Sequence, residues 1–399
     1  MTSSPRVAPS RFATHFDVVI AGGGIIGSSI AYHLASAGVG AICVVERDPT
    51  YEFAATPRSN GGIRRLFSRQ QNIEMAAYGL EFYRNFAATM GVDDTPAEVS
   101  FRRQGYLFVS DAGGAEQMER NFELQSAMGV EVEMLSPTSL QERFPSLAVN
   151  DVDLAVLSDH DAWIDPHAAL IGFRNKARAL GVHYVQDEVT GFDHDDRAIR
   201  AAKTAGGERL EADWFVNACG AWCAPLAAMV GMDLPVQPMS RESYYFLSEM
   251  TLEPLPFVKT ETDLAIRPEG RGYVGGLPAW DEKDGWNFDI SPDYFMDVMW
   301  PALARRIPAM QTLKLERSWR GHYARSLLDL SPYICRWTDG LSNFVLANGF
   351  SGHGIMHAPA TGRAVTELLS EGVFKSIDLS CFDFDRVKSE QPFRELGIV

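Results

Sequence analysis

Three glycines near the start of the chain, Gly22, Gly24 and Gly27, constrain the fold more than any other feature. An apolar stretch that begins at Asp17 precedes them, and an apolar helical stretch and a second apolar run ending at Glu46 follow. In such a pattern the first glycine permits a tight turn, the second lets a pyrophosphate approach the backbone, and the third lets the helix close onto the strand. A terminal acid can accept hydrogen bonds from a ribose. The order of these elements predicts a dinucleotide-binding βαβ unit.

Composition and charge exclude several classes of partner. The chain has 399 residues, of which 46% are hydrophobic, which is enough for a large core and two domains. Its formal net charge of −16 argues against nucleic acid or an anionic membrane surface, because phosphate binding needs clustered cations. No apolar run approaches the roughly 18 residues of a membrane span. His353 and His357 are four residues apart, but no acid lies between them and no third ligand is evident, so no metal site is predicted.

The N-terminal residues and the cysteines bear on the cellular compartment. The first fifteen residues are rich in Ser, Pro and Arg and lack an apolar core, which indicates a frayed terminus rather than a secretory signal. Arg6 and Arg11, with no acid nearby, leave an organelle-targeting segment as the alternative. The five cysteines are scattered and odd in number, which suits free thiols in a reducing compartment. The sequence therefore predicts a cytoplasmic protein, with a mitochondrial location as the alternative.

Hydrophobic periodicity along the rest of the chain predicts an α/β fold with a second, mixed-sheet unit. The nucleotide-binding domain is expected to be discontinuous, made of residues 1–92, 151–235 and 318–399, and the substrate-binding domain to comprise 93–150 and 236–317. The pattern predicts helices over 72–90, 114–128, 167–180, 291–307 and about 357–369. It predicts strands over 96–110, 131–135, 183–186, 188–192, 213–217, 236–247, 262–277, 313–323 and 344–347.

Later segments extend the argument to nearly the whole chain. The loop Ser-Asn-Gly-Gly at 59–62, Asn-Ala-Cys-Gly-Ala-Trp at 217–222, Ile-Arg-Pro at 266–268, Trp-Arg-Gly at 319–321 and Asn-Gly-Phe-Ser-Gly-His-Gly-Ile-Met at 348–356 follow the fingerprint in this order. Together they resemble the D-amino-acid oxidase superfamily of FAD-dependent oxidoreductases. The resemblance is greatest to its sarcosine oxidase and glycine oxidase branch, of the FAD-dependent oxidoreductase domain-containing type. It implies a Rossmann-like FAD-binding domain of the glutathione-reductase type and an α+β substrate domain.

The resemblance also assigns the FAD-binding residues. The fingerprint would hold the ADP half, the loop at 59–63 would lie along the pyrophosphate and isoalloxazine, and Val189 would offer its backbone to adenine. The turn at 352–356 would place N–H groups at the flavin N1/O2 edge, where the following helix N-terminus stabilises negative charge. Some relatives attach FAD to a cysteine near 321–325, which has none here, so noncovalent FAD is expected. The assigned residues are Gly22, Gly24, Ile25, Ile26, Gly27, Glu46, Arg47, Ser59, Asn60, Gly61, Gly62, Ile63, Val189, Ala218, Gly220, Trp222, Gly352, His353, Gly354, Ile355 and Met356.

Arginines beside these motifs indicate an anionic substrate. Guanidinium meets a carboxylate bidentately and stays charged when buried, so a carboxylate of the substrate is the expected ligand, with structural ion pairs as the alternative. Several such cations favour an amine with more than one carboxylate, similar to iminodiacetate, over plain sarcosine. Aromatic side chains could wall the pocket and contact the amine. The candidate catalytic residues are Arg64, Arg65, Arg267, Arg320, Tyr245, His322, Tyr323 and His353.

The reaction implied is oxidation of the C–N bond of a small secondary amine of the N-substituted glycine type to an imine, hydrolysed to amine and oxo-acid. Oxidation of a 2-hydroxy acid or a D-amino acid on the same scaffold, and a flavin-containing assembly factor, are the alternatives. The electron acceptor stays open between O2 and an electron carrier. Asn287 stands where oxidases of the family carry a lysine, with Lys283 nearby, and Met356 stands where another family lysine is expected. The oligomeric state is not predicted.

Overall fold

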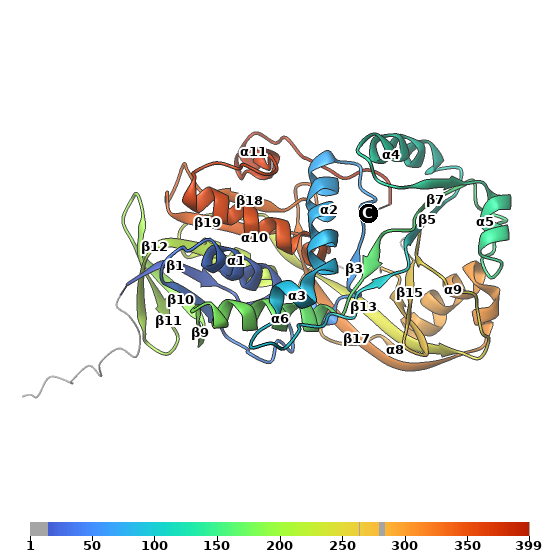
Figure 1. The fold of residues 1–399 in the computed structure, drawn as a ribbon, viewed down its shortest axis with the longest axis horizontal. Coiled ribbons are helices and arrows are strands. Elements are labelled where there is room, and N and C mark those ends of the chain that lie inside the picture. The colour runs from blue at the N-terminus through green and yellow to red at the C-terminus, as the bar shows by residue number, and fades with distance from the viewer. Residues whose placement is uncertain (1–14, 263, 279–283, 399) are drawn as a thin grey trace, which may run out of the picture.

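The chain folds around two large sheets that lie side by side, each with its own covering helices (Figure 1). The structure is a computed structural model that describes residues 15–262, 264–278 and 284–398. The predicted frayed terminus therefore lies outside the described residues. None of the helices in the described ranges is long and apolar enough to cross a membrane.

The first sheet has the parallel strand–helix–strand arrangement that the glycine motif predicts. Its first strand pairs in parallel with two others, one of them more than 190 positions along the chain. Distant segments therefore build one sheet, in line with the predicted discontinuous assembly. The strands are β1 (His15–Ala21), β2 (Ile42–Glu46), β9 (His183–Gln186), β10 (Val189–His194), β11 (Ile199–Thr204), β12 (Arg209–Asn217), β18 (Tyr333–Arg336) and β19 (Phe344–Asn348).

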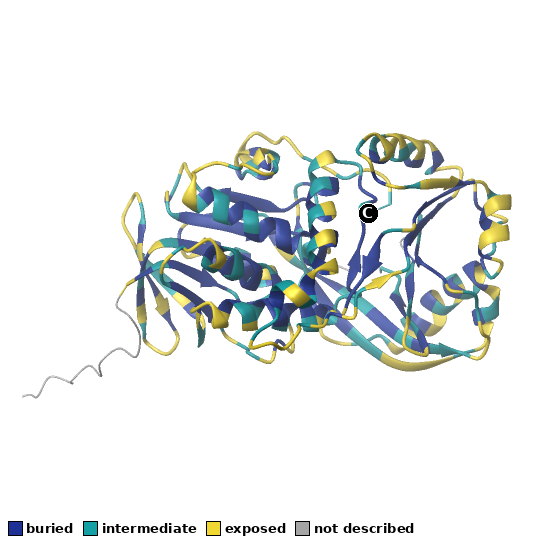
Figure 2. Cartoon of the chain, viewed as in Figure 1, coloured by how far each residue is buried: buried dark blue, intermediate teal, exposed yellow. Residues whose placement is uncertain are grey.

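Helices cover both faces of this sheet. On one face, α1 (Ile25–Ser36) lies between α6 (Pro166–Ala179) and α10 (Gly354–Ser370). On the other face, α7 (Cys223–Ala228) packs against a core that contains Phe215 of β12. Strands buried on both faces are apolar throughout rather than alternating, as the Ile-Cys-Val-Val run of β2 is. Figure 2 shows this burial along the central strands.

The second sheet is mixed and carries a long antiparallel pair, β13 and β17, that runs outward from the junction with the first sheet (Figure 1). A short helical segment, η3 (Phe295–Met299), and α9 (Trp300–Arg306) pack on its outer face, with Phe295 and Leu303 in the core. The strands are β5 (Tyr106–Ser110), β6 (Glu133–Leu135), β7 (Leu154–Ser158), β13 (Val236–Ser248), β14 (Phe257–Thr260), β15 (Ala265–Glu269), β16 (Gly272–Gly276) and β17 (Leu313–Ser326).

Smaller elements join the two sheets. A three-stranded sheet lies between them, and the remaining helical segments are distributed around both sheets. The strands are β3 (Gly62–Ile63), β4 (Arg102–Arg103) and β8 (Ala162–Trp163), and the helices are η1 (Thr56–Arg58), α2 (Gln70–Arg84), α3 (Phe86–Met90), α4 (Ala115–Ala127), α5 (Pro137–Arg143), η2 (Gly220–Trp222), α8 (Pro292–Tyr294), η4 (Pro308–Gln311), η5 (Ser380–Phe382) and α11 (Asp385–Lys388).

Several element boundaries differ from those predicted. The single helix expected over 72–90 is two helices, because the Asn85 side chain donates to the Glu81 carbonyl at 3.0 Å and ends α2 there. The last long helix begins at Gly354 rather than near 357. The prediction missed this start because the N-cap residue, His353, makes no side-chain capping hydrogen bond and is not a typical capping residue.

Six short strands, β3, β7, β8, β11, β14 and β18, were not predicted. Both β7 and β17 pair within the second sheet, although the predicted boundaries would assign 154–158 and 318–326 to the FAD-binding domain. Membership of a strand in one sheet does not by itself define where a domain begins or ends, so the domain boundaries stay a prediction.

Candidate active site

The predicted dinucleotide turn forms between β1 and α1. Gly22 has a φ of +96°, which L side chains rarely adopt, and its N–H donates to the carbonyl of Val45 at 2.9 Å. A Cβ at Gly27 would collide with the Gly22 carbonyl oxygen, so this glycine lets the helix close onto the turn. A Cβ at Gly24 would meet no described atom within 4 Å. The turn is therefore tightly packed on one side and open on the side of Gly24.

Glu46 closes the far side of this turn. Its two carboxylate oxygens accept N–H groups from Gly23 at 2.7 Å and from Asp48 at 2.9 Å. Burial raises the pKa of Glu46, and these two hydrogen bonds oppose the shift. Each oxygen keeps further lone pairs, so the carboxylate is oriented and can still accept a ribose hydroxyl. Val189 begins β10 close by, since the carbonyl of Glu46 accepts the N–H of Asp187.

The arrangement fits the ADP half of FAD. The first-turn N–H groups of a helix have no intrahelical acceptor, and no side chain of the described chain caps α1. They lie beside the open face of Gly24 and can meet a pyrophosphate. The Arg47 guanidinium carbon lies 4.1 Å from the ring centre of Trp222, which forms η2 with Gly220, and the Ala218 carbonyl lies against Gly22. These assigned residues therefore lie near the glycine turn and Glu46.

Replacing Gly24 with valine tests this assignment. We expect the variant to bind FAD about tenfold more weakly or worse, because the side chain would occupy the approach of the pyrophosphate. The apoprotein should lose no more than about 1 kcal/mol of stability, since the position is an N-cap with open space. Gly27→Val is the contrast, in which folding should fail too. A Gly24→Val protein that purifies with a full complement of FAD would contradict the assignment.

The loop at 59–63 is fixed by backbone contacts. Gly61 has a φ of +70° and packs against the carbonyl of Ile164, while its N–H donates to Ser59 Oγ at 3.1 Å. Ile63 then pairs in β3 with β8. The Asn60 Oδ1 atom is buried and has no hydrogen-bond partner within the described ranges. Such an orphaned acceptor fits a loop that lies along a bound cofactor.

The turn before α10 faces the second sheet. Gly352, with a φ of +103°, lies against the ring of Tyr323 on β17. The carbonyl of Ile355 accepts the Tyr83 hydroxyl at 2.8 Å, and Met356 packs its carbonyl on Gly79, so α2 holds the first turn of α10 in place. The N-terminus of α10 is thereby aimed at the junction between the two sheets, where its positive dipole end can meet negative charge.

Arg64 and His353 meet at this helix terminus. Arg64 Nη2 lies 3.2 Å from His353 Nε2, and Nη1 of the same guanidinium donates to the Leu66 carbonyl. The guanidinium carbon lies 4.1 Å from the ring centre of Phe67. Burial first, then the charge of Arg64, and after it His357 and Lys259, lower the pKa of His353 well below its ordinary value. The imidazole is therefore neutral at neutral pH, with Nε2 accepting from Arg64 and the proton on Nδ1.

The other three candidate arginines contact carboxylates of the chain itself. Arg65 Nε donates to the fully buried Asp161 at 2.8 Å. Arg320 pairs with Glu242, which is equally buried, and also donates to Ser240 Oγ at 2.9 Å.

Arg267 pairs with Glu269 and donates to the carbonyl of Asn60 at 2.7 Å, which fastens the 59–63 loop to β15. These contacts favour the structural alternative for Arg65, Arg267 and Arg320, although their assignment as catalytic stays a prediction.

The aromatic candidates lie on different faces of β17 and β13. Tyr323 faces the turn at Gly352, and since consecutive residues of a strand point to opposite faces, His322 points away from it. His322 Nε2 accepts the N–H of Asn287 at 3.1 Å, and its ring lies 4.6 Å from that of Phe288. Tyr245 lies farther along β13, with Arg317 at 5.6 Å from its ring. The structure thus brings Tyr323, Arg64 and His353 together, but not Tyr245 or His322; Lys283 lies outside the described residues.

Two cations on the inner face of the second sheet were missed at the sequence level. Lys259 pairs in register with Phe108 and Ala265, and it contributes to the lowered pKa of His353. Arg241 stands opposite Gly321 in the register of β13 and β17. The run Phe-Val-Lys-Thr does not alternate between apolar and polar residues, so no pattern in the sequence identified Lys259.

Comparisons with known proteins agree with this geometry. The family model described as FAD dependent oxidoreductase matches residues 17–368. The chain is 35% identical to FAD-dependent oxidoreductase domain-containing protein 1 of Xenopus laevis, over 96% of this chain and 85% of that protein. It is 27% identical to 4-methylaminobutanoate oxidase (formaldehyde-forming) of Paenarthrobacter nicotinovorans, over 95% of this chain and 46% of that protein. The solved structure of L-proline dehydrogenase from P. horikoshii superimposes with a TM-score of 0.85 at 26% identity, covering 96% of this chain and all of that one.

Proposed function

The chain belongs to the family of FAD-dependent oxidoreductases, and from that premise we propose that it oxidises the C–N bond of a small secondary amine that carries a carboxylate. The product is an imine, which water hydrolyses to an amine and an oxo-acid. Family membership confirms the predicted fold class, FAD as the cofactor and oxidoreductase activity. When bound, FAD accepts the two electrons of the C–H bond that is broken.

The observation that carries the proposal is the contact between Arg64 and His353 at the N-terminus of α10, with the charge of Lys259 also acting on His353. Two cations and a helix N-terminus together provide a site for a substrate carboxylate. Because His353 is neutral, it keeps the Arg64 guanidinium oriented without adding a third positive charge near the substrate amine. Two of the similar proteins support the substrate class, since 4-methylaminobutanoate and L-proline are both secondary amines with one carboxylate.

The substrate that we propose carries one carboxylate rather than two. The expectation of an iminodiacetate-like compound depended on four arginines being available. Arg65, Arg267 and Arg320 instead contact Asp161, Glu269 and Glu242 of the chain itself. The charges of Arg64 and Lys259, which act on His353, suit a single carboxylate.

Anaerobic reduction of the bound flavin tests the proposal. The holoenzyme is mixed with sarcosine, L-proline, 4-methylaminobutanoate and iminodiacetate, and the loss of visible flavin absorbance is followed. We expect at least one monocarboxylate to reduce the flavin, and to do so faster than iminodiacetate. Lactate serves as the control for oxidation of a 2-hydroxy acid. A flavin that lactate reduces while every amine leaves it oxidised would refute the proposal.

A further inference from the structure

A cavity of about 150 Å³ lies between α4 and the inner face of the second sheet, next to the residues around Arg64. Its walls are mostly apolar, formed by Leu66, Phe108, Met118, Val156 and Ile398. The ring of Phe108 also lies 5.2 Å from the Arg64 guanidinium carbon, so this wall is shared with the candidate active site. Its polar lining residues are Ser110, Asn121, Gln125 and Glu261, and we refer to the cavity as the Gln125–Glu261 pocket.

Gln125 and Glu261 each have a side-chain oxygen that accepts no hydrogen bond from any described group. Gln125 is only 4% exposed; its Nε2 donates to the Phe67 carbonyl at 3.0 Å, while Oε1 has no partner in the described chain. Glu261 Oε2 is likewise buried and lacks a partner there. A buried acceptor without a donor is destabilising. Two of them in one apolar pocket indicate a ligand that brings donors.

The charges around the pocket specify a cation. Burial raises the pKa of Glu261; a backbone hydrogen bond and the charge of Arg306 oppose this shift, and Asp111 and Asp151 add to it. The nearest cation, Arg306, makes a bidentate pair with Asp151 and reaches Glu261 Oε1 only at 4.0 Å. Three carboxylates around one guanidinium leave this end of the pocket negative. A bound ammonium would stabilise the ionised Glu261 and satisfy both orphaned acceptors.

The opposite end of the same sheet face is positive. Glu261 lies two residues after Lys259, in the turn that follows β14, which puts their Cα atoms about 7 Å apart. Phe108, the register partner of Lys259, lines the pocket together with Glu261. Lys259 and Arg64 lie toward His353, and Glu261 lies in the pocket. A ligand that spans the two ends would carry a carboxylate at one end and a cation at the other.

We propose that the Gln125–Glu261 pocket is a specificity subsite that receives the distal ammonium of the substrate on an aliphatic stem. The proposal deepens the proposed function, since it assumes that the substrate carboxylate binds at Arg64 and Lys259. Asn121 of α4 donates to the Leu396 carbonyl at 2.9 Å, and the Gly397 and Ile398 that follow form part of the pocket wall. Figure 1 shows the end of the described chain between α2 and α4.

The test compares 6-aminohexanoate with hexanoate, which have the same carbon chain and carboxylate and differ in the terminal ammonium. Binding to the holoenzyme is measured by calorimetry, which does not require turnover. We expect 6-aminohexanoate to bind about tenfold more tightly or better, the effect of one charge-assisted hydrogen bond. Glu261→Gln should abolish this preference and leave hexanoate binding unchanged, and Gln125→Leu should reduce it.

Glu116→Gln is the matched control, because it makes the same Glu-to-Gln change at an exposed position of α4, the helix that carries Gln125. Equal affinity for the two probes, or no binding of either, would overturn the subsite. A preference for 6-aminohexanoate that survives in both Glu261→Gln and Gln125→Leu would overturn it as well. If the preference depends on Glu261 while no amine reduces the flavin, the subsite stands and the proposed reaction falls. If amines reduce the flavin but the two probes bind equally, the proposed reaction stands and the subsite falls.

Discussion

Replacing Arg64 with methionine is expected to lower kcat/KM for the best amine of the panel by about 30-fold to several thousand-fold. This range corresponds to the roughly 2–5 kcal/mol that removal of one partner of a buried charged contact costs. Arg64 is 3% exposed and lies against His353 and the ring of Phe67. Methionine keeps the apolar stem on Phe67 and removes only the guanidinium. We therefore expect slower reduction of the flavin by substrate, measured anaerobically, and an unchanged FAD content.

The adjacent Arg65 provides the control. Its partner Asp161 is fully buried, so Arg65→Met leaves an uncompensated carboxylate in the core and should lower the free energy of unfolding by about 3–5 kcal/mol. The Arg64 variant should thus change the kinetics and the Arg65 variant the stability. Urea unfolding of both variants, beside the flavin-reduction kinetics, would separate the two effects. An Arg64→Met enzyme with normal FAD content and kcat/KM within about threefold of the parent would contradict the assigned role.

The cofactor half of the site was predictable because its signals are local. Gly22, Gly24 and Gly27 are required by backbone conformation and by a close approach within a single βαβ unit. Glu46 ends the strand that pairs directly with β1. Each of these constraints acts over a few residues along one turn, so residue type and spacing suffice to identify them.

The substrate half was less predictable because partners meet across the fold. Arg65 and Asp161 are 96 positions apart, and Arg320 and Glu242 are 78 apart, so no local pattern shows that their charges are matched. Residue type alone could not separate them from Arg64. Lys259 was missed for a different reason, since β14 is a four-residue strand and only its register with β5 places this side chain near His353.

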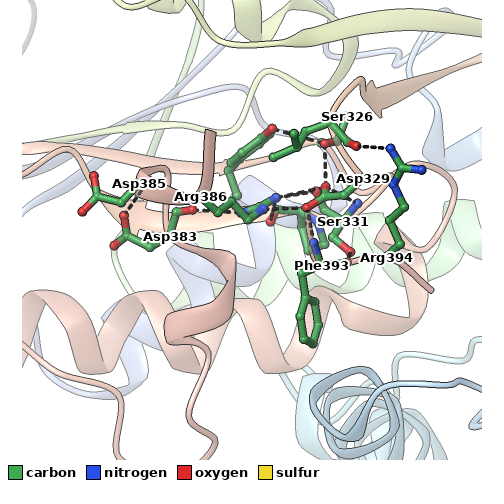
Figure 3. Close-up of polar contacts among 12 residues, drawn as sticks. Ser326, Asp329, Ser331, Asp383, Asp385, Arg386, Phe393 and Arg394 are labelled. Atoms are coloured by element: carbon green, nitrogen blue, oxygen red, sulfur yellow. Dashed lines mark hydrogen bonds and ion pairs between the residues drawn. The ribbon is translucent and has the colours of Figure 1, made fainter. Parts of the chain in front are cut away.

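A buried ion pair holds the segment that lines the Gln125–Glu261 pocket (Figure 3). Asp329 Oδ2 accepts Arg386 Nε at 2.8 Å and the N–H of Phe393 at 2.9 Å. Its Oδ1 accepts Ser326 Oγ and the N–H of Ser331, both at 3.0 Å. The carboxylate is therefore the common acceptor for a loop, a helix and the following segment.

Replacing Asp329 with asparagine is expected to lower the free energy of unfolding by about 3–5 kcal/mol. Asparagine removes the negative charge that compensates the buried Arg386 and places an NH2 group where two donors now converge. Urea unfolding followed by circular dichroism would measure the loss. Asp385→Asn is the control, because Asp385 is exposed and its contact with Lys388 is a surface pair worth about 0–1 kcal/mol.

Loss of the Asp329 acceptor should also release the segment after Phe393. Arg394 is exposed, and in the parent protein its carbonyl accepts Arg69 Nε at 2.7 Å. In Asp329→Asn we expect faster tryptic cleavage after Arg394 under native conditions, because local opening there no longer breaks the bond from Phe393 to a carboxylate. Since Gly397 and Ile398 line the pocket, the same variant should bind 6-aminohexanoate more weakly. Stability and cleavage within the range of Asp385→Asn would show that Asp329 does not anchor this segment.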